Sequence, residues 1–365
     1  MARAKDRRIL LINPFGIGDV IFTTPVIQSI KSAFPGSYIG YLCNKRTAPI
    51  LFSDPSVGVV FVFEKDEYRR LWQLSKTSCI ASAWRLFRRI GRERFDTMLD
   101  FSMAREYSFF SMLAGIRRRI GYNYKNRGVF LTDKVEIANG YCGRHVVDYH
   151  KSLLALLNPA IDLQAIPKVY VLEEDIRKAG SLLRSCGMDL TDKYLCVMPG
   201  AGASWGLTAF RRRWPIERFA SAVSRLAGKL PLKIVLLGSP DESKLCDFIK
   251  EAVPAVVNLC GRCSLMESVA VLKHAKVLLT NDGGPLHMSA ATGTKTVSIF
   301  GPVPENVYGP YPDCGRYIIL RDRSLPCSPC YKNFNLPACD DLKCLNNISV
   351  DMAVEAVEDL YQRDI

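Results

Sequence analysis

Short apolar runs alternate along the chain with amphipathic segments and with turns rich in glycine and proline. In the second half, apolar runs at residues 194–198, 233–237, 277–280 and 296–300 have the length of buried strands. The segments between them have helical spacing, and one of them carries Pro215 in its first turn. Repeated strand, turn and helix predict a doubly wound α/β domain, whose ligand-binding loops follow the carboxyl ends of the strands.

The first half repeats this alternation less clearly. Residues 8–13 predict a buried strand, which a turn at 14–18 connects to a helix over 19–33, and 38–42 predicts the next strand. Further on, 72–90 has the spacing of one helix with arginines on one face, and 95–100 is strand-like.

The length of 365 residues exceeds what one hydrophobic core usually organises. We therefore predict two Rossmann-like domains facing a cleft, over residues 1–168 and 169–348, followed by a C-terminal helix over 349–365. No apolar run reaches the length of a membrane span.

Positive charge is concentrated in the first half. The formal net charge is +13, and residues 65–127 alone hold 15 Lys/Arg against 6 Asp/Glu. Such a field favours an anionic partner, such as a phospholipid surface or a phosphorylated substrate, although a solvated basic face without a partner is the alternative. The arginines lack the interleaved aromatic residues of single-strand platforms, so we expect no nucleic acid.

The chain is expected to stay in the cytoplasm. Its start is basic and then apolar, like a signal peptide, but Asn13, Pro14 and Asp19 interrupt it before any cleavage site. The odd number of 13 cysteines would leave an exchange-prone thiol in a secreted protein, which favours a reducing compartment.

The first candidate site is the turn that ends the opening strand. Gly16 and Gly18 allow a tight backbone, and the helix that follows presents free amides. Ile21 stands where a dinucleotide-binding motif has its third glycine, so the turn does not match that motif. Asp19 is interpreted either as the N-cap of the helix or as a carboxylate that the helix dipole keeps ionised, which suits a general base.

Three loops of the second half suit a nucleotide diphosphate. Arg212 precedes a helix and follows a glycine-rich loop that includes Ser204, although a solvated basic turn would also explain it. Asp282, Gly283 and Gly284 follow a strand and open a helix, with Asp282 expected to orient an arginine. Two further candidates are Glu242, at a helix start, where it suits ribose hydroxyls, and His287, for which simple burial is the alternative.

Four cysteines lie close together near the end of the second half, within residues 327–344. Cys327, Cys330, Cys339 and Cys344 could form a tetrahedral thiolate site for structural zinc, or remain reduced packing thiols, or pair as disulfides.

The chain resembles glycosyltransferase family 9, the lipopolysaccharide heptosyltransferase family. The resemblance is carried by the order and spacing of Arg8-Ile-Leu-Leu-Ile-Asn13, Gly16-Ile-Gly-Asp-Val20, Thr24-Pro25, Lys31, Arg119-Ile-Gly121, Pro199-Gly200, Arg212-Arg-Trp-Pro215, Leu259-Cys-Gly261, Ser264-Leu265, Asn281-Asp-Gly-Gly-Pro-Leu-His287 and Phe300-Gly-Pro302.

The resemblance implies a GT-B fold and an inverting transfer that requires no cofactor. The second domain would bind ADP-heptose, and the first would bind a lipid-linked or phosphorylated core oligosaccharide at the anionic cytoplasmic face of the inner membrane, with which the protein would associate peripherally. Asp19 matches the general base of the family, Arg212 its phosphate-contacting lysine, and Glu242 its ribose-holding acid. Arginine at 212 and glycine at 283 depart from the family pattern. Alternatives are another sugar nucleotide or surface-glycan acceptor, and a non-catalytic relative that only binds sugar nucleotides.

Overall fold

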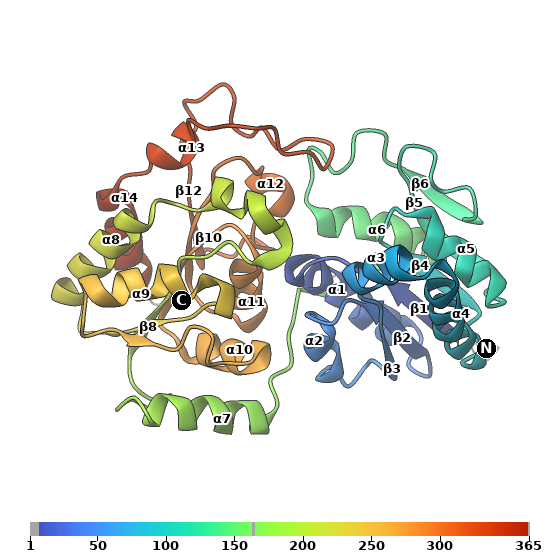
Figure 1. The fold of residues 1–365 in the computed structure, drawn as a ribbon, viewed down its shortest axis with the longest axis horizontal. Helices are drawn as coiled ribbons and strands as arrows, with labels where there is room; N and C mark the ends of the chain where they lie inside the picture. Colours follow the sequence, from blue (N-terminus) through green and yellow to red (C-terminus); the bar gives the residue numbers. More distant parts are fainter. Residues whose placement is uncertain (1–6, 163–164, 364–365) are drawn as a thin grey trace. The chain divides into compact units, whose positions relative to one another are not determined.

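A computed structural model describes residues 7–162 and 165–363, with the backbone alone at 203–205 and 207. The chain divides into two compact units, Met1–Pro167 (unit 1) and Lys168–Ile365 (unit 2). Each unit is built around its own sheet with helices packed against it (Figure 1). None of the helices in the described ranges is both long and apolar enough to cross a bilayer.

Unit 1 contains a parallel six-stranded sheet in the order β3-β2-β1-β4-β5-β6. Its strands are β1 (Arg8–Ile12), β2 (Tyr38–Cys43), β3 (Val59–Val62), β4 (Thr97–Asp100), β5 (Arg118–Asn123) and β6 (Asp133–Glu136), and its helices are α1 (Ile17–Ala33), α2 (Ala48–Phe52), α3 (Lys65–Leu74), α4 (Lys76–Arg92), α5 (Arg105–Leu113) and α6 (Val146–Leu157). The helix α1 packs with α6, whereas α4 packs with α3 and α5, as a doubly wound fold requires.

The single helix predicted over 72–90 is wrong, because the chain breaks at Ser75. This residue has an extended backbone, with φ −159° and ψ 109°, and separates α3 from α4. Its hydroxyl accepts a hydrogen bond from the backbone N–H of Ser78 at 3.2 Å, so Ser75 is the N-cap of α4. Serine competes with the helix through such local bonds and is favoured at caps.

Unit 2 contains a second parallel six-stranded sheet, in the order β12-β11-β10-β7-β8-β9. Its strands are β7 (Tyr194–Met198), β8 (Lys233–Leu236), β9 (Val257–Asn258), β10 (Val277–Asn281), β11 (Thr296–Ile299) and β12 (Tyr317–Leu320). Its helices are α7 (Glu173–Arg184), η1 (Ala203–Arg212), α8 (Ile216–Lys229), η2 (Pro240–Glu242), α9 (Ser243–Ala252), α10 (Leu265–His274), α11 (Gly284–Thr292), α12 (Glu305–Tyr308), α13 (Lys343–Asn346) and α14 (Val350–Gln362). The strands predicted for the second half are confirmed.

The core of unit 2 follows from the two-residue period of its strands. Leu195 and Val197 of β7 are in register with Val277 and Leu279 of β10, and all four side chains belong to one core with residues of α8, α9 and α14. Trp214 is buried in this core, and its Nε1 donates a hydrogen bond to the carbonyl of Ile348 at 3.0 Å. Its indole therefore packs in the core, and removing such a side chain costs about 3–5 kcal/mol.

Candidate active site

Both sheets reverse their strand order at a point where ligands bind in folds of this kind. In unit 1 the order reverses between β1 and β4, and in unit 2 it reverses between β7 and β10. In doubly wound folds the loops after two such strands diverge to opposite faces of the sheet, and ligands bind between them at the carboxyl ends. The predicted site residues of each unit lie in or beside these loops.

Asp19 lies in the first turn of α1, just beyond the carboxyl end of β1. Its Oδ2 accepts a hydrogen bond from the backbone N–H of Gly16 at 3.0 Å, and its carbonyl accepts one from Asn13 Nδ2, also at 3.0 Å. The N-cap is Gly16, so the interpretation of Asp19 as the N-cap is wrong, and the residue occupies the third helical position. The N-terminus of α1 favours a negative charge on this half-buried carboxylate.

The two glycines of this turn have ordinary backbone conformations. Gly16 has φ −74° and ψ 178°, which any residue adopts, and Gly18 lies within α1. The local conformation therefore does not require glycine at 16, contrary to our expectation.

Asp100 ends β4 beside the carboxyl end of β1 and was not among the predicted site residues. It is paired in register with Ile12, and it is buried. Burial raises the pKa of Asp100 to about 7, although the Ser102 hydroxyl and backbone N–H, which donates to Asp100 Oδ1 at 2.8 Å, favour the ionised form. The available signal was its position, because an acidic residue directly after a predicted buried strand falls at the ligand-binding edge of the sheet.

Glu242 forms hydrogen bonds with two loops of unit 2, the one after β7 and the one after β8. Its Oε1 accepts a hydrogen bond from Gly202 N at 3.1 Å, and its Oε2 accepts from the backbone N–H of Ser239 at 2.9 Å and from the Ser239 hydroxyl at 3.0 Å. The side chain is buried and passes so close to Gly200 that a Cβ there would lie 1.7 Å from Oε1. Glu242 thus fixes the loop after β7 relative to the turn after β8, and its contact with ribose stays a prediction.

Asn281, at the end of β10, holds the same loop from the other side. Its Nδ2 donates to the carbonyls of Pro199 at 2.7 Å and Gly200 at 3.2 Å, and its Oδ1 accepts from Trp214 N at 2.9 Å. The side chain is fully buried. The motif around Asn281 does not by itself predict these contacts with the loop, because the partners of Asn281 lie about 70–80 residues away in the sequence.

Arg212 forms a buried ion pair with Asp282. The pair joins Arg212 Nη2 to Asp282 Oδ2, and the side chains are 6% and 3% exposed. Burial raises the pKa of Asp282, and the Arg212 guanidinium opposes that effect. The interpretation of Arg212 as part of a solvated turn is therefore wrong, and Asp282 orients an arginine, as expected. Asp282 Oδ1 is also buried and, within the described residues, accepts no hydrogen bond.

Gly283 lets the two glycine loops approach each other. Its φ of 155° lies in a region that disfavours other residues, and a Cβ there would come within 2.9 Å of the carbonyl oxygen of Ala201. Gly284 begins α11, and His287 is buried inside that helix. The side chain of Ser204 lies outside the described residues.

A model of glycosyltransferase family 9 (heptosyltransferase) matches residues 83–337 of the chain. The chain belongs to glycosyltransferase family 9. The predicted family and the predicted enzyme class, a glycosyltransferase, are thereby confirmed.

Relatives of this family 9 glycosyltransferase are similar over nearly the whole chain. The lipooligosaccharide heptosyltransferase 2 of Campylobacter jejuni is 23% identical over 360 residues, which cover 97% of this chain and 98% of the relative. The crystal structure of a family 9 glycosyltransferase from Veillonella parvula has a TM-score of 0.82 and 23% identity, and covers 99% of both chains. The E. coli heptosyltransferase WaaC with ADP has a TM-score of 0.74 and 18% identity, and covers 97% of this chain and 99% of that one. The predicted GT-B fold class is confirmed by these similarities and by the two parallel sheets.

The four C-terminal cysteines of the family 9 chain lie within electrostatic reach of one another. The pKa of the Cys344 thiol is raised to about 11, mainly by burial and also by the nearby Cys330, Cys339 and Cys327. Cys330 donates its backbone N–H to the carbonyl of Pro302 at 3.0 Å. Across the described ranges, no three His, Cys, Asp or Glu side chains are grouped as a metal ion requires. The zinc site stays a prediction.

Proposed function

We propose that this family 9 enzyme transfers heptose from ADP-heptose to the inner core of lipopolysaccharide, with inversion at the anomeric carbon and Asp19 as the general base. The proposal is supported by the relative from C. jejuni, which is named a lipooligosaccharide heptosyltransferase, and by the similar E. coli heptosyltransferase, whose structure was solved with ADP. The acceptor would be a lipid-linked, phosphorylated core oligosaccharide at the cytoplasmic face of the inner membrane.

The observation that carries the proposal is the arrangement around the buried Arg212–Asp282 pair. The pair lies where the Pro199–Gly202 loop, the Asp282–Gly284 turn and the start of α11 meet at the reversal point of the unit 2 sheet. Backbone amides at a helix N-terminus, together with a guanidinium held in place by a carboxylate, suit the two phosphates of a nucleotide sugar. Each charge-assisted hydrogen bond contributes about 1.5–3 kcal/mol.

In the proposed reaction an acceptor hydroxyl attacks the anomeric carbon of the heptose. A new C–O bond forms, the bond between that carbon and the β-phosphate oxygen breaks on the opposite face, and ADP leaves with the bonding pair. Asp19 accepts the proton of the hydroxyl, while Arg212 and the loop amides stabilise the charge that develops on the leaving phosphate. The hydrogen bond from Gly16 N holds the Asp19 carboxylate in position before the acceptor arrives.

Mass spectrometry of a purified core oligosaccharide, incubated with the protein and ADP-heptose, tests this function. We expect a mass gain of one heptose, and no gain with the Asp19→Asn variant over the same time. A wild-type protein that binds donor and acceptor but never transfers sugar would instead be a non-catalytic relative. Transfer from a different sugar nucleotide would refute the donor assignment.

Thermal unfolding with ADP, UDP and GDP tests the nucleotide separately. A ligand present at 100 times its Kd stabilises the folded protein by about 2.7 kcal/mol, which is readily seen as a rise in Tm. We expect ADP to give this rise. Stabilisation by UDP or GDP with none by ADP would contradict the proposed donor.

A further inference from the structure

The α3–α5 side of unit 1 exposes large apolar side chains beside arginines. Trp84 and Ile80 of α4 are 51% and 58% exposed, Leu74 at the end of α3 is 83% exposed, and Leu113 at the end of α5 is 49% exposed. We call these residues, together with Trp72 and the arginines of α4, the α3–α5 surface. Exposed apolar side chains that are grouped and bordered by polar residues are typical of binding surfaces.

The spacing on α4 separates a core-facing side from an exposed side. Ala83, Phe87 and Ile90 are buried against unit 1. Ile80, Trp84 and Arg88 follow one another at intervals of four residues and therefore lie in one exposed row. The helix carries five basic residues and no acidic residue in its sequence, KTSCIASAWRLFRRIGR. An exposed apolar row within a wholly basic helix is the pattern of a helix that lies on a membrane surface.

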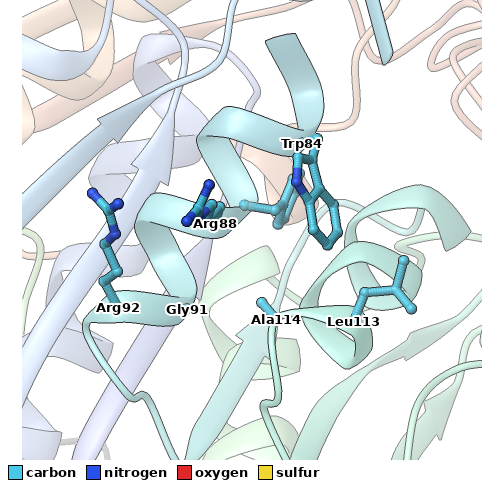
Figure 2. A pocket seen from close by; sticks show the side chains of 7 residues that line it. Trp84, Arg88, Gly91, Arg92, Leu113 and Ala114 are labelled. Carbon is cyan, nitrogen blue, oxygen red and sulfur yellow. The ribbon is translucent and has the colours of Figure 1, made fainter. Parts of the chain in front are cut away.

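A pocket of about 310 Å³ opens on this surface between α4 and the end of α5. It is lined by Trp84, Phe87, Arg88, Gly91, Arg92, Leu113 and Ala114. Figure 2 shows the indole of Trp84 on one side of the pocket and Leu113 and Ala114 on the other, with Arg88 and Arg92 along α4. A Cβ at Gly91 would lie 3.2 Å from the carbonyl oxygen of Ala114, so glycine lets α4 pack closely there.

We propose that the α3–α5 surface docks on an anionic phospholipid bilayer. Trp84, Ile80 and Leu74 enter the interface between headgroups and acyl chains, the arginines contact lipid phosphates, and the pocket takes part of a lipid. The inference rests on the proposed function, because docking at a bilayer serves an enzyme whose acceptor is anchored in that bilayer.

Charge distinguishes a bilayer from the other partners that an apolar surface could bind. A second copy of the chain in a twofold contact would bring the arginines of both copies to the same interface, and like charges would oppose the contact. A nucleic acid would match the charge and could stack on Trp72 and Trp84, but it would give the exposed aliphatic side chains of Ile80 and Leu74 no apolar environment. An anionic bilayer offers phosphates to the arginines and acyl chains to the aliphatic side chains.

Flotation with lipid vesicles tests the proposal on the full-length protein. We expect the wild type to bind vesicles of phosphatidylglycerol and phosphatidylethanolamine and not vesicles of phosphatidylcholine. Trp84→Ser should weaken binding about tenfold, as expected for a side chain that loses an apolar environment. Arg88→Glu should weaken it at least about fivefold, because one basic residue near an anionic surface contributes about that factor.

The helix α9 of unit 2 offers a matched control. Lys244 and Phe248 are exposed there and are also four residues apart, like Trp84 and Arg88. Lys244→Glu and Phe248→Ser should leave vesicle binding unchanged. Because the four substituted side chains are exposed, the Tm should stay close to that of the wild type, which separates a docking effect from misfolding.

Several outcomes would overturn the docking proposal. One is binding to phosphatidylcholine vesicles as strong as to the anionic vesicles. Another is a loss of binding in the α9 variants as large as in the α4 variants. A third is a dimer, detected by light scattering, that Trp84→Ser dissociates. Transfer to a delipidated core oligosaccharide separates this proposal from the proposed function. Vesicle binding without any sugar transfer would refute the function and support docking, whereas transfer without vesicle binding would refute docking alone.

Discussion

Replacing Asp282 by asparagine is expected to destabilise unit 2 more than replacing Arg212 by methionine, although both substitutions break the same buried ion pair. A guanidinium does not release its proton in proteins, so Asp282→Asn leaves a fixed positive charge in a site that is 6% exposed. A carboxyl group can take up a proton, and burial already raises the pKa of Asp282. In Arg212→Met the remaining partner can therefore become neutral.

The magnitudes follow from the burial of the pair. Leaving one charge of a buried pair unpaired costs about 3–5 kcal/mol, which we expect for Asp282→Asn at all pH values. A neutral but unsatisfied carboxyl costs about 1–3 kcal/mol, which we expect for Arg212→Met at low pH. Since folding raises the pKa of Asp282 in that variant, its stability should fall as the pH rises above the usual carboxyl range. The double variant Arg212→Met/Asp282→Leu should be close to the wild type.

Urea unfolding at pH 5 and pH 8, followed by tryptophan fluorescence, measures these differences. Trp214 lies in the unit 2 core and reports on its unfolding. The surface pair between Lys178 and Glu174, at 2.7 Å and with side chains 53% and 58% exposed, is the control, and Glu174→Gln should lower the free energy of unfolding much less than either single variant. The reasoning is refuted if Arg212→Met is the less stable single variant at pH 5, or if the double variant loses the sum of the two single effects.

Three further predictions concern single residues. Asp19→Asn keeps a hydrogen-bond acceptor for the Gly16 N–H but removes the base, so kcat should fall at least about 100-fold with little change in KM for the donor. The control is Asp148→Asn, which alters an acidic residue in the first turn of α6 and should leave kcat unchanged in the same assay. Folding raises the pKa of Asp100 from 3.8 to about 7, so the folded protein holds a proton that the unfolded chain has released, and stability falls as the pH rises between these values. Asp100→Asn should therefore stabilise the protein by about 2–3 kcal/mol more at pH 8 than at pH 5 in urea unfolding, and an equal effect at both pH values would contradict the assignment. Gly283→Ala would place a Cβ against the facing loop, so it should lower the free energy of unfolding by about 1–3 kcal/mol in thermal unfolding. The control Gly228→Ala, near the end of α8 with open space around it, should raise that free energy by about 0.4–1 kcal/mol. Equal effects of the two substitutions would contradict the crowding argument.

The secondary structure was predictable wherever the hydrophobic residues of a segment had the regular spacing of a single helix or strand. The strands of unit 2 predicted from the sequence are buried runs of four or five residues, and each is followed by a turn and a further element of the doubly wound pattern. The strand β6, with the sequence DKVE, was missed because it lies at a sheet edge and has no apolar run. The break between α3 and α4 was missed because the helical spacing continues across Ser75, whose cap depends on a local hydrogen bond.

The candidate site was predictable to the level of loops but not of contacts. Glycines, arginine and acidic residues that follow predicted strands identified segments near the carboxyl ends of the strands, because those ends meet at one edge of a parallel sheet. The sequence predicts that Asp282 orients an arginine, but it does not identify that arginine as Arg212 or show that Glu242 bonds to Gly202, since those partners are 70 and 40 residues apart. It also gives no burial for Asp100, and burial is what raises its pKa.

The Pro199–Gly202 loop of unit 2 is held in its conformation mainly by side chains from neighbouring segments, rather than by its own residues. Asn281 fixes the Pro199 and Gly200 carbonyls from β10, and Glu242 fixes Gly202 N from the turn after β8. Each of these buried groups would cost about 1–3 kcal/mol if left unpaired, so the loop is held before any ligand binds. In the proposed reaction, such preorganisation would let the Arg212 guanidinium bind a phosphate without first ordering the loop, and fixed donors of this kind stabilise a leaving diphosphate most effectively.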